Sequence, residues 1–252
     1  MKTVSRLLAA TAAITGLFPV AANARPATAI KNIVLVHGAF ADGSGWKPVA
    51  DILIKDGYTV SIVQPPETTL EEDIAATNRI LDRQDGLAVL VGHSYGGAII
   101  TGAGNNAHVK TLVYVAAFQP DVGESIAKLG ASMPPAGKSV APTSDGFLFI
   151  APAGFRSDFA ADVPKEQTDF MAMSQVGLSL KAATTEAIAP AWKTKPSYAI
   201  VATEDRSINP DLERMMYKRS RSITTEIKAS HAVYISQPQA VAEVIEQAAS
   251  AR

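Results

Sequence analysis

The sequence predicts an α/β fold in which helices cover both faces of one mainly parallel sheet. Two observations carry this prediction: short apolar runs rich in β-branched residues recur along the chain, and helical patterns lie between them. Near-continuous apolar runs are typical of strands that are buried on both faces, as in a parallel sheet. Strands that alternate with helices form the right-handed crossovers of a doubly wound sheet. A length of 252 residues is enough for one such domain.

The predicted strands are Ile33–Val36, Thr59–Val63, Leu87–Val91, Val109–Ala116, Tyr198–Ala202 and Thr224–Ile227. The predicted helices are Trp46–Lys55, Leu70–Arg83, Ala98–Gly104, Pro210–Arg219 and Pro238–Ala249. The second helix has a defined start, because Thr68 or Thr69 is followed three residues later by a glutamate and either pair makes a capping box.

One long segment interrupts this alternation. Residues 119–190 separate the fourth and fifth predicted strands, a connection far longer than the usual few residues. They contain five of the eight phenylalanines, namely Phe147, Phe149, Phe155, Phe159 and Phe170. We expect an inserted cap over the carboxyl-terminal edge of the sheet, where open α/β sheets bind ligands, with some of these rings lining a pocket. The alternative is a structural insertion whose aromatic residues fill only its own small core.

Residues 1–24 are predicted to be a secretory signal peptide. Two basic residues open this segment, an apolar run follows at Leu7–Val20, and small residues stand at Ala22 and Ala24. A membrane anchor is the alternative, but the run is shorter than the ~20 apolar residues of a spanning helix. We therefore expect a single mature domain of residues 25–252, exported to the periplasm or outside the cell without a stable membrane anchor.

The composition excludes several classes of function. With 23 Lys+Arg against 24 Asp+Glu, the formal net charge of −1 gives no basis for a nucleic-acid partner or an anionic membrane surface. The chain has no cysteine, which excludes disulfides, thiol nucleophiles and zinc–thiolate sites. The sequence gives no indication of the oligomeric state.

A serine between glycines follows the third predicted strand. The segment Gly92–Gly96, with Ser94 at its centre, stands between a buried strand and a helix, which is the setting of a nucleophile elbow. Such a turn lifts the Ser94 hydroxyl clear of the sheet, and the helix directs its N-terminal N–H groups at the same place. An ordinary glycine-rich turn is the alternative. The setting predicts Ser94 as a catalytic nucleophile.

A serine nucleophile needs a base, and the chain offers four histidines. His37 ends the first strand, His93 lies within the elbow, and His108 precedes the fourth strand. His231 follows the last strand at the sheet edge that carries Ser94, so position and elimination predict it as the base. The alternative is a structural histidine at a strand end.

The base needs a carboxylate that holds its tautomer and stabilises its positive charge. Asp205 leaves the fifth strand at the same sheet edge, with Glu204 beside it and Asp121 after the fourth strand as alternatives. We favour Asp205, because nucleophile, then acid, then histidine is the chain order for this kind of elbow.

The oxyanion of a tetrahedral intermediate needs two N–H donors. Tyr95 offers the backbone N–H that follows the nucleophile. The loop after the first strand offers the second, and we expect Ala39 rather than Phe40, because Gly38 allows a close backbone approach there. The alternative is a turn with no role in binding.

With these residues assembled, the chain resembles an α/β-hydrolase of the small branch that contains plant methylesterases, hydroxynitrile lyases and many bacterial esterases. The resembling segments are Val34–Ala39, Gly43–Trp46, Gly92–Gly97, Val113–Phe118, Thr203–Asp205 with Pro210, and Ser230–His231. The resemblance covers the mature chain except the cap and implies an α/β-hydrolase fold with about six strands. It implies that Ser94, Asp205 and His231 form a catalytic triad. It also implies that Ala39 and Tyr95 are the oxyanion donors, with no cofactor, metal or partner protein.

Two departures from the branch narrow the expected chemistry. Its hydroxynitrile lyases carry a lysine just after the catalytic histidine and a threonine just after the first-strand histidine, where this chain has Ala232 and Gly38. The resemblance therefore favours a serine hydrolase that cleaves small carboxylic esters through an acyl-enzyme on Ser94. The alternatives are a lactonase, thioesterase or amidase with the same triad, and a protein that binds a small ligand without catalysis.

Overall fold

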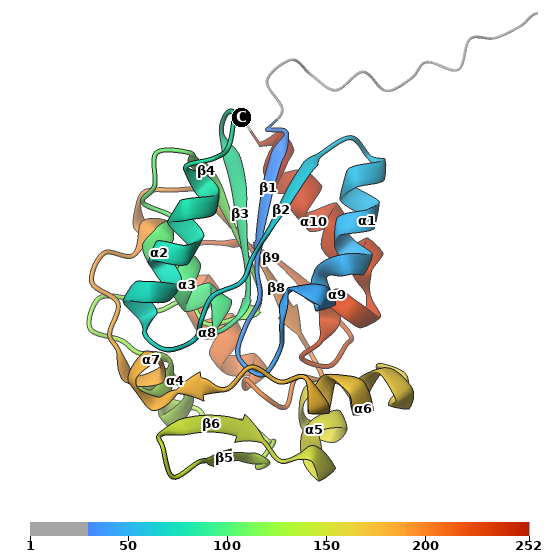
Figure 1. Cartoon of the computed structure of the whole chain (residues 1–252). Coiled ribbons are helices and arrows are strands. Elements are labelled where there is room, and N and C mark those ends of the chain that lie inside the picture. Colours follow the sequence, from blue (N-terminus) through green and yellow to red (C-terminus); the bar gives the residue numbers. More distant parts are fainter. Residues whose placement is uncertain (1–29, 252) are drawn as a thin grey trace, which may run out of the picture.

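The protein is described by a computed structural model that covers residues 30–251, so the predicted signal peptide lies outside the described residues. Within them, six strands form one sheet (Figure 1). The strands are β1 Asn32–Val36, β2 Thr59–Val63, β3 Ala88–Ser94, β4 Val109–Ala117, β8 Ser197–Ala202 and β9 Ile223–Ile227. Their order is β2-β1-β3-β4-β8-β9, and every neighbouring pair is parallel. This confirms the predicted parallel sheet.

Helices cover both faces of the sheet. One face packs against α1 Lys47–Lys55, α9 Val233–Ser236 and α10 Pro238–Ser250, and the other against α2 Leu70–Leu81, α3 Gly96–Ala103 and α8 Pro210–Ser220. In β1, Ile33 and Leu35 belong to the first of these two cores, whereas Val34 and Val36 belong to the second. Because successive side chains of a strand point to opposite faces, a strand between two helical layers needs apolar residues throughout.

The N-cap of α2 is Thr69, one of the two predicted candidates, but the capping box is formed only in part. The hydroxyl of Thr69 accepts the backbone N–H of Glu72 at 3.1 Å and so caps the first turn. The side chain of Glu72 in turn accepts a hydrogen bond from the hydroxyl of Thr68, the other candidate. The helix ends at Leu81, two residues before the predicted end.

The cap follows β4 and lies across the carboxyl-terminal ends of the parallel strands (Figure 1). Its helices are α4 Ile126–Ser132, α5 Pro152–Phe159, α6 Lys165–Met173 and α7 Leu180–Thr184. Its strands β5 Val140–Pro142, β6 Phe147–Ile150 and β7 Leu178–Ser179 form a small antiparallel sheet in the order β5-β6-β7. Two 3₁₀ turns, η1 Gly43–Trp46 and η2 Ala191–Lys193, complete the elements. The predicted position of the cap is correct, while its elements were not predicted.

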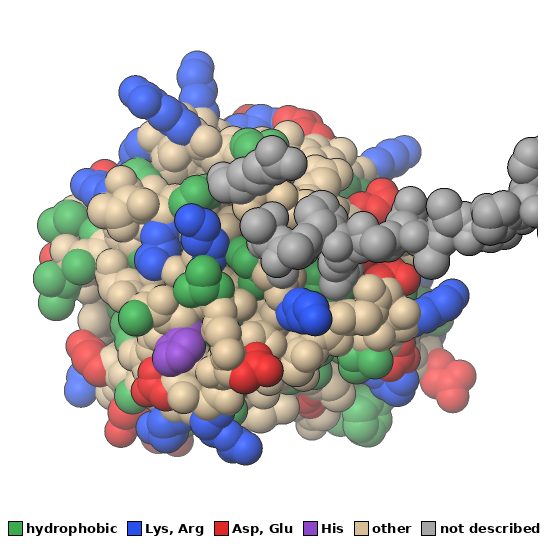
Figure 2. Space-filling model, turned by 90° about the horizontal axis from the view of Figure 1, so that it is seen from above, with side chains coloured by type: hydrophobic (Ala, Val, Ile, Leu, Met, Phe, Trp, Pro, Cys, Tyr) green, Lys and Arg blue, Asp and Glu red, His purple; other side chains and the backbone are tan. Residues whose placement is uncertain are grey.

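The face at the amino ends of the strands, opposite the cap, carries basic and acidic side chains interspersed (Figure 2). This mixture agrees with the formal net charge of −1. Across residues 30–251, we find no helix with the length and apolarity that a membrane span requires.

Candidate active site

Strand β3 ends in a tight turn that presents Ser94. The strand reaches Ser94, and α3 begins two residues later at Gly96. Ser94 has a φ of 53°, in the left-handed region that non-glycine residues adopt only at a cost in free energy. A Cβ atom on Gly92 would lie 2.5 Å from the carbonyl oxygen of Gly96, so a side chain at Gly92 would prevent the turn. The structure thus contains the strand–turn–helix arrangement that an elbow requires.

The side chains of Ser94, His231 and Asp205 form one hydrogen-bonded chain. Ser94 Oγ lies 2.8 Å from Nε2 of His231, and Nδ1 of His231 lies 2.5 Å from Oδ2 of Asp205. Because a carboxylate only accepts, Nδ1 of His231 donates to Asp205 and Nε2 is left to accept from the serine hydroxyl. Asp205 follows β8 and His231 follows β9, so the carboxyl ends of these parallel strands bring the two side chains to the elbow.

Backbone amides hold the carboxylate of Asp205 in place. Its Oδ1 accepts the N–H groups of Ser207 at 2.6 Å and Ile208 at 2.9 Å. The three hydrogen-bonded residues are also shielded from solvent, with relative exposures of 7% for Ser94, 4% for Asp205 and 1% for His231. Electrostatic interactions are stronger in such a site than in water.

The alternative acids and the remaining elbow histidine have other partners. Glu204 and Asp121 each form an ion pair with a lysine. His93 is fully buried, and its Nε2 donates to the backbone carbonyl of His231 at 3.0 Å. Burial lowers the pKa of His93 well below its ordinary value, so this ring is neutral and supports the loop that carries His231.

The loop after β1 lies against the elbow. A Cβ atom on Gly38 would lie 2.5 Å from Cβ of Ser94 and 3.1 Å from the backbone N of Tyr95. Phe40, the alternative oxyanion donor, gives its N–H to a backbone carbonyl of the cap at 3.0 Å. That partner leaves Ala39 and Tyr95 as the two candidate donors.

We expect Gly38→Ala to lower kcat/KM by about 10²–10³-fold, because the added methyl group would push the loop away from the elbow and displace one oxyanion donor. Ester hydrolysis and circular dichroism would separate lost activity from lost folding. Gly130→Ala is the matched control, since a methyl group there meets no atom within 4 Å. Equal activity of the two variants would contradict the assignment of this loop to the oxyanion site.

Comparison with protein families shows which family has this fold. Residues 33–244 match the model of the alpha/beta hydrolase family. The chain belongs to this family. The match spans all six strands of the main sheet except the first residue of β1 and includes Ser94, Asp205 and His231.

Individual relatives of this α/β-hydrolase are described as hydrolases too. A carbendazim hydrolyzing esterase of Nocardioides sp. (strain SG-4G) is 35% identical over 121 residues, which is 41% of this chain and about half (49%) of that esterase. The alpha/beta hydrolase nvfD of Aspergillus novofumigatus (strain IBT 16806) is 26% identical over 86% of this chain and 96% of its own. The crystal structure of the pyrethroid hydrolase PytH is 25% identical and superposes with a TM-score of 0.77 over 88% of this chain and 98% of that one.

A buried polar cluster next to the loop after β1 was not predicted from the sequence. Glu67, in the loop after β2, is fully buried, and its Oε1 lies 3.4 Å from Nδ1 of His37. The other ring nitrogen of His37 lies 3.1 Å from Oε1 of Gln64, so oxygens face both sides of the imidazole. Burial lowers the pKa of His37, but Glu67 and the carbonyl of Gly38 outweigh it and the net shift is upward. Burial raises the pKa of Glu67 to about 7 against the opposing effect of His37.

At pH 8, we expect His37→Ala to lower the free energy of unfolding by about 3–5 kcal/mol, because it leaves the buried carboxyl of Glu67 without its imidazole partner. Urea denaturation of the two variants His37→Ala and His37→Ala/Glu67→Gln would test this. The double variant should recover part of the loss, since a glutamine neither carries an unpaired charge nor has to take up a proton at pH 8. A double variant as unstable as the single one would show that the pair is not the source of the effect.

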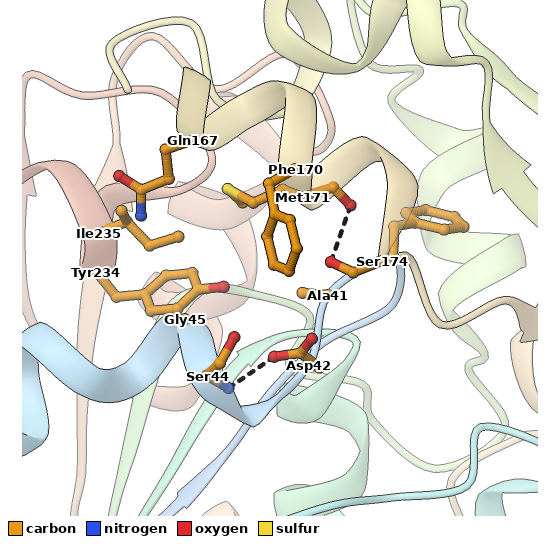
Figure 3. A pocket seen from close by; sticks show the side chains of 11 residues that line it. Ala41, Asp42, Ser44, Gly45, Gln167, Phe170, Met171, Ser174, Tyr234 and Ile235 are labelled. Atoms are coloured by element: carbon orange, nitrogen blue, oxygen red, sulfur yellow. Dashed lines mark hydrogen bonds between the residues drawn. The ribbon is translucent and has the colours of Figure 1, made fainter. Parts of the chain in front are cut away.

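An open pocket lies beside the loop after β1, between that loop, α6 and α9 (Figure 3). Its lining residues are Phe40, Ala41, Asp42, Ser44, Gly45, Gln167, Phe170, Met171, Ser174, Tyr234 and Ile235. Phe170 points from the cap helix into this space (Figure 3), whereas Phe155 and Phe159 are buried in the core. Phe170 therefore has the expected role at a pocket, whereas Phe155 and Phe159 pack into the main core beside the sheet instead of filling a separate core of the cap. Among the described residues, no group of three or more His, Asp or Glu side chains is placed to hold a metal ion.

Proposed function

We propose that this α/β-hydrolase is a serine esterase that cleaves small carboxylic esters through an acyl-enzyme on Ser94. The observation that carries the proposal is the 2.8 Å contact between Ser94 Oγ and His231 Nε2, with Asp205 on the other ring nitrogen. The names of two relatives, a carbendazim hydrolyzing esterase and a pyrethroid hydrolase, support the same class of reaction.

In the first half of the proposed reaction, His231 takes the proton of Ser94 as Oγ attacks the ester carbonyl carbon. The carboxylate of Asp205 stabilises the imidazolium that forms. The N–H groups of Ala39 and Tyr95 donate to the oxyanion of the tetrahedral intermediate. His231 then gives its proton to the departing alcohol, which leaves the acyl group on Ser94.

Water completes the proposed cycle. His231 removes a proton from a water molecule that attacks the acyl-enzyme, and the same two N–H groups stabilise the second oxyanion. Collapse of this intermediate releases the carboxylic acid, and His231 returns its proton to Ser94 Oγ. Ser94, His231 and Asp205 therefore have the same hydrogen bonds before and after each turnover.

The cap favours a substrate with an apolar group. The pocket beside the loop after β1 has walls from Phe170, Met171 and Ile235, and apolar walls suit a medium acyl chain or an aromatic ring.

We also propose that the mature chain works in the periplasm or outside the cell. The support is that residues 1–24 begin with basic residues and continue with an apolar run.

The test is steady-state and rapid-mixing kinetics of the mature chain with p-nitrophenyl butyrate, together with a lactone, a thioester and an amide of matched acyl group. We expect ester turnover with a burst of p-nitrophenol, since the acyl-enzyme forms before water releases it. A preference for the lactone, the thioester or the amide would assign the enzyme to that class of substrate instead of esters. Lack of turnover on all four, with no labelling by a fluorophosphonate probe, would favour a protein that binds its ligand without catalysis.

A further inference from the structure

A fully buried carboxyl group that the proposed mechanism does not use lies behind Asp205. Glu213 is on α8, and its side chain is 0% exposed, with Leu212 and Met216 beside it in the apolar core. Its Oε2 accepts the backbone N–H of Ala202, at the end of β8, at 3.2 Å. Its Oε1 has no N–H or O–H partner among the described residues, and the side chain is close enough to the carboxyl group of Asp205 for a hydrogen bond between the two acids.

Two touching carboxyl groups in a buried site do not both carry a negative charge, because the repulsion and the loss of water both favour a proton on one of them. Asp205 is the better site for the charge. It accepts three N–H groups, from His231 at 2.5 Å, Ser207 at 2.6 Å and Ile208 at 2.9 Å. Glu213 accepts only the one longer hydrogen bond from Ala202. Glu213 is therefore the group that holds the proton, which can form a hydrogen bond between the carboxyl groups of Glu213 and Asp205.

The groups around Glu213 agree with this assignment. The titratable side chains that face it in the described chain are Asp205, Tyr217 and Arg214, with His231 beyond Asp205. The hydroxyl of Tyr217 is engaged with the backbone of Ala117, and the guanidinium of Arg214 is at the surface in ion pairs with other carboxylates. Burial, followed by Asp205, raises the pKa of Glu213 well above its ordinary value. The N–H of Ala202 and the charge of Arg214 act in the opposite direction but do not outweigh burial and Asp205.

We propose that Glu213 is a neutral carboxylic acid that donates a hydrogen bond to Asp205 and so holds this carboxylate in the orientation that accepts from His231. Glu213 touches no reacting atom and is thus a positioning residue, whose catalytic effect rests on the function proposed above. Its donated hydrogen bond also spreads the charge of Asp205, which sets how strongly Asp205 attracts the proton of the imidazolium.

The direct test is infrared spectroscopy of the full chain at neutral pH. The difference spectrum between the wild type and Glu213→Gln should show the carbonyl band of a protonated carboxylic acid, because the band of Glu67, whose pKa is about 7, is common to both proteins and cancels. Thermal melting from about pH 5 to about pH 8 gives a second readout that is independent of activity. Because the unfolded chain releases this proton at lower pH than the folded chain, the wild type should lose Tm relative to Glu213→Gln as the pH rises.

Kinetics of two variants test the positioning role. Glu213→Gln keeps a donor toward Asp205 and an acceptor toward Ala202, so its kcat should stay close to that of the wild type. Glu213→Leu removes the donor and should lower kcat on the order of tenfold to hundredfold with little change in KM. In this variant the acid limb of the kcat/KM profile should move to higher pH, because Asp205 then attracts the proton of His231 more strongly.

Glu204→Gln is the matched control, because it makes the same change on an exposed side chain one residue before Asp205. The difference in Tm between this variant and the wild type should not vary with pH. The proposal is overturned if the difference spectrum between the wild type and Glu213→Gln shows no band of a protonated carboxylic acid. It is also overturned if Glu213→Gln loses as much kcat as Glu213→Leu. A chain with the band and the melting trend but without any ester turnover would support the proton on Glu213 and contradict the proposed function alone.

Discussion

Ser94→Ala should lower kcat/KM for p-nitrophenyl butyrate by roughly 10⁴-fold or more. The substitution removes only Oγ, the atom that lies 2.8 Å from Nε2 of His231 and that would form the acyl-enzyme. The backbone around Ser94 and the N–H groups of the proposed oxyanion site stay in place. Any remaining rate above that of uncatalysed hydrolysis should come from those groups and from substrate binding, and it should show no burst of p-nitrophenol.

The fold of this variant is checked by its melting temperature, which should stay close to that of the wild type because the removed hydroxyl is a small part of a packed turn. Substrate binding without turnover would be seen as unchanged affinity for a non-hydrolysable ester analogue. Retention of wild-type activity by Ser94→Ala would show that another group performs the hydrolysis.

Asp205→Asn is expected to lower kcat by about 10⁴-fold while it leaves the positions of the other residues intact. An amide in this place can present its NH₂ group to Nδ1 of His231, and the imidazole then carries its proton on Nε2. In that tautomer Nε2 donates instead of accepting, so it no longer takes the proton of Ser94. The measurement is kcat with p-nitrophenyl butyrate across the pH range in which the variant stays folded.

The alternative acids provide the controls for Asp205. Glu204→Gln and Asp121→Asn change carboxylates that pair with lysines rather than with His231, so both variants should keep wild-type kcat. A loss of activity in either of them that matches the loss in Asp205→Asn would contradict the choice of Asp205.

The main sheet was predictable because its signals are local. The apolar side chains of Ile33–Val36 point to both faces of the sheet. All five positions of β1 are buried between two helical layers. Thr69 caps α2 through its own hydroxyl, which a reader of the sequence can expect from residue types alone. The positions of Ser94, Asp205 and His231 followed from the rule that parallel strands end at one edge.

The cap was predictable as an insertion but not in its elements. Strand β5 is exposed at all three positions, and β7 has only two residues, so neither shows an apolar alternation. These strands exist because they pair with β6, which is a tertiary property. The division of the cap rings between core and pocket also depends on how its helices pack.

The buried acids Glu67 and Glu213 carry no sequence signal of their role. Glu67 stands in a loop after two prolines, and its backbone carbonyl is covered by a hydrogen bond from Ser179 of the cap at 2.9 Å. Glu213 lies in a helix with ordinary charged neighbours, and only the fold turns it toward Asp205. In both cases, burial arises from segments that are distant in the sequence.

The central claim is that Ser94 is the nucleophile which His231 activates, and covalent labelling tests it most directly. The mature chain would be treated with a fluorophosphonate probe and examined by intact mass and peptide mapping. We predict one adduct per chain, located on the peptide that contains Ser94, with loss of ester turnover in proportion to labelling. Rapid ester turnover by a chain that takes up no probe at Ser94, or that carries it at a different residue, would contradict the account.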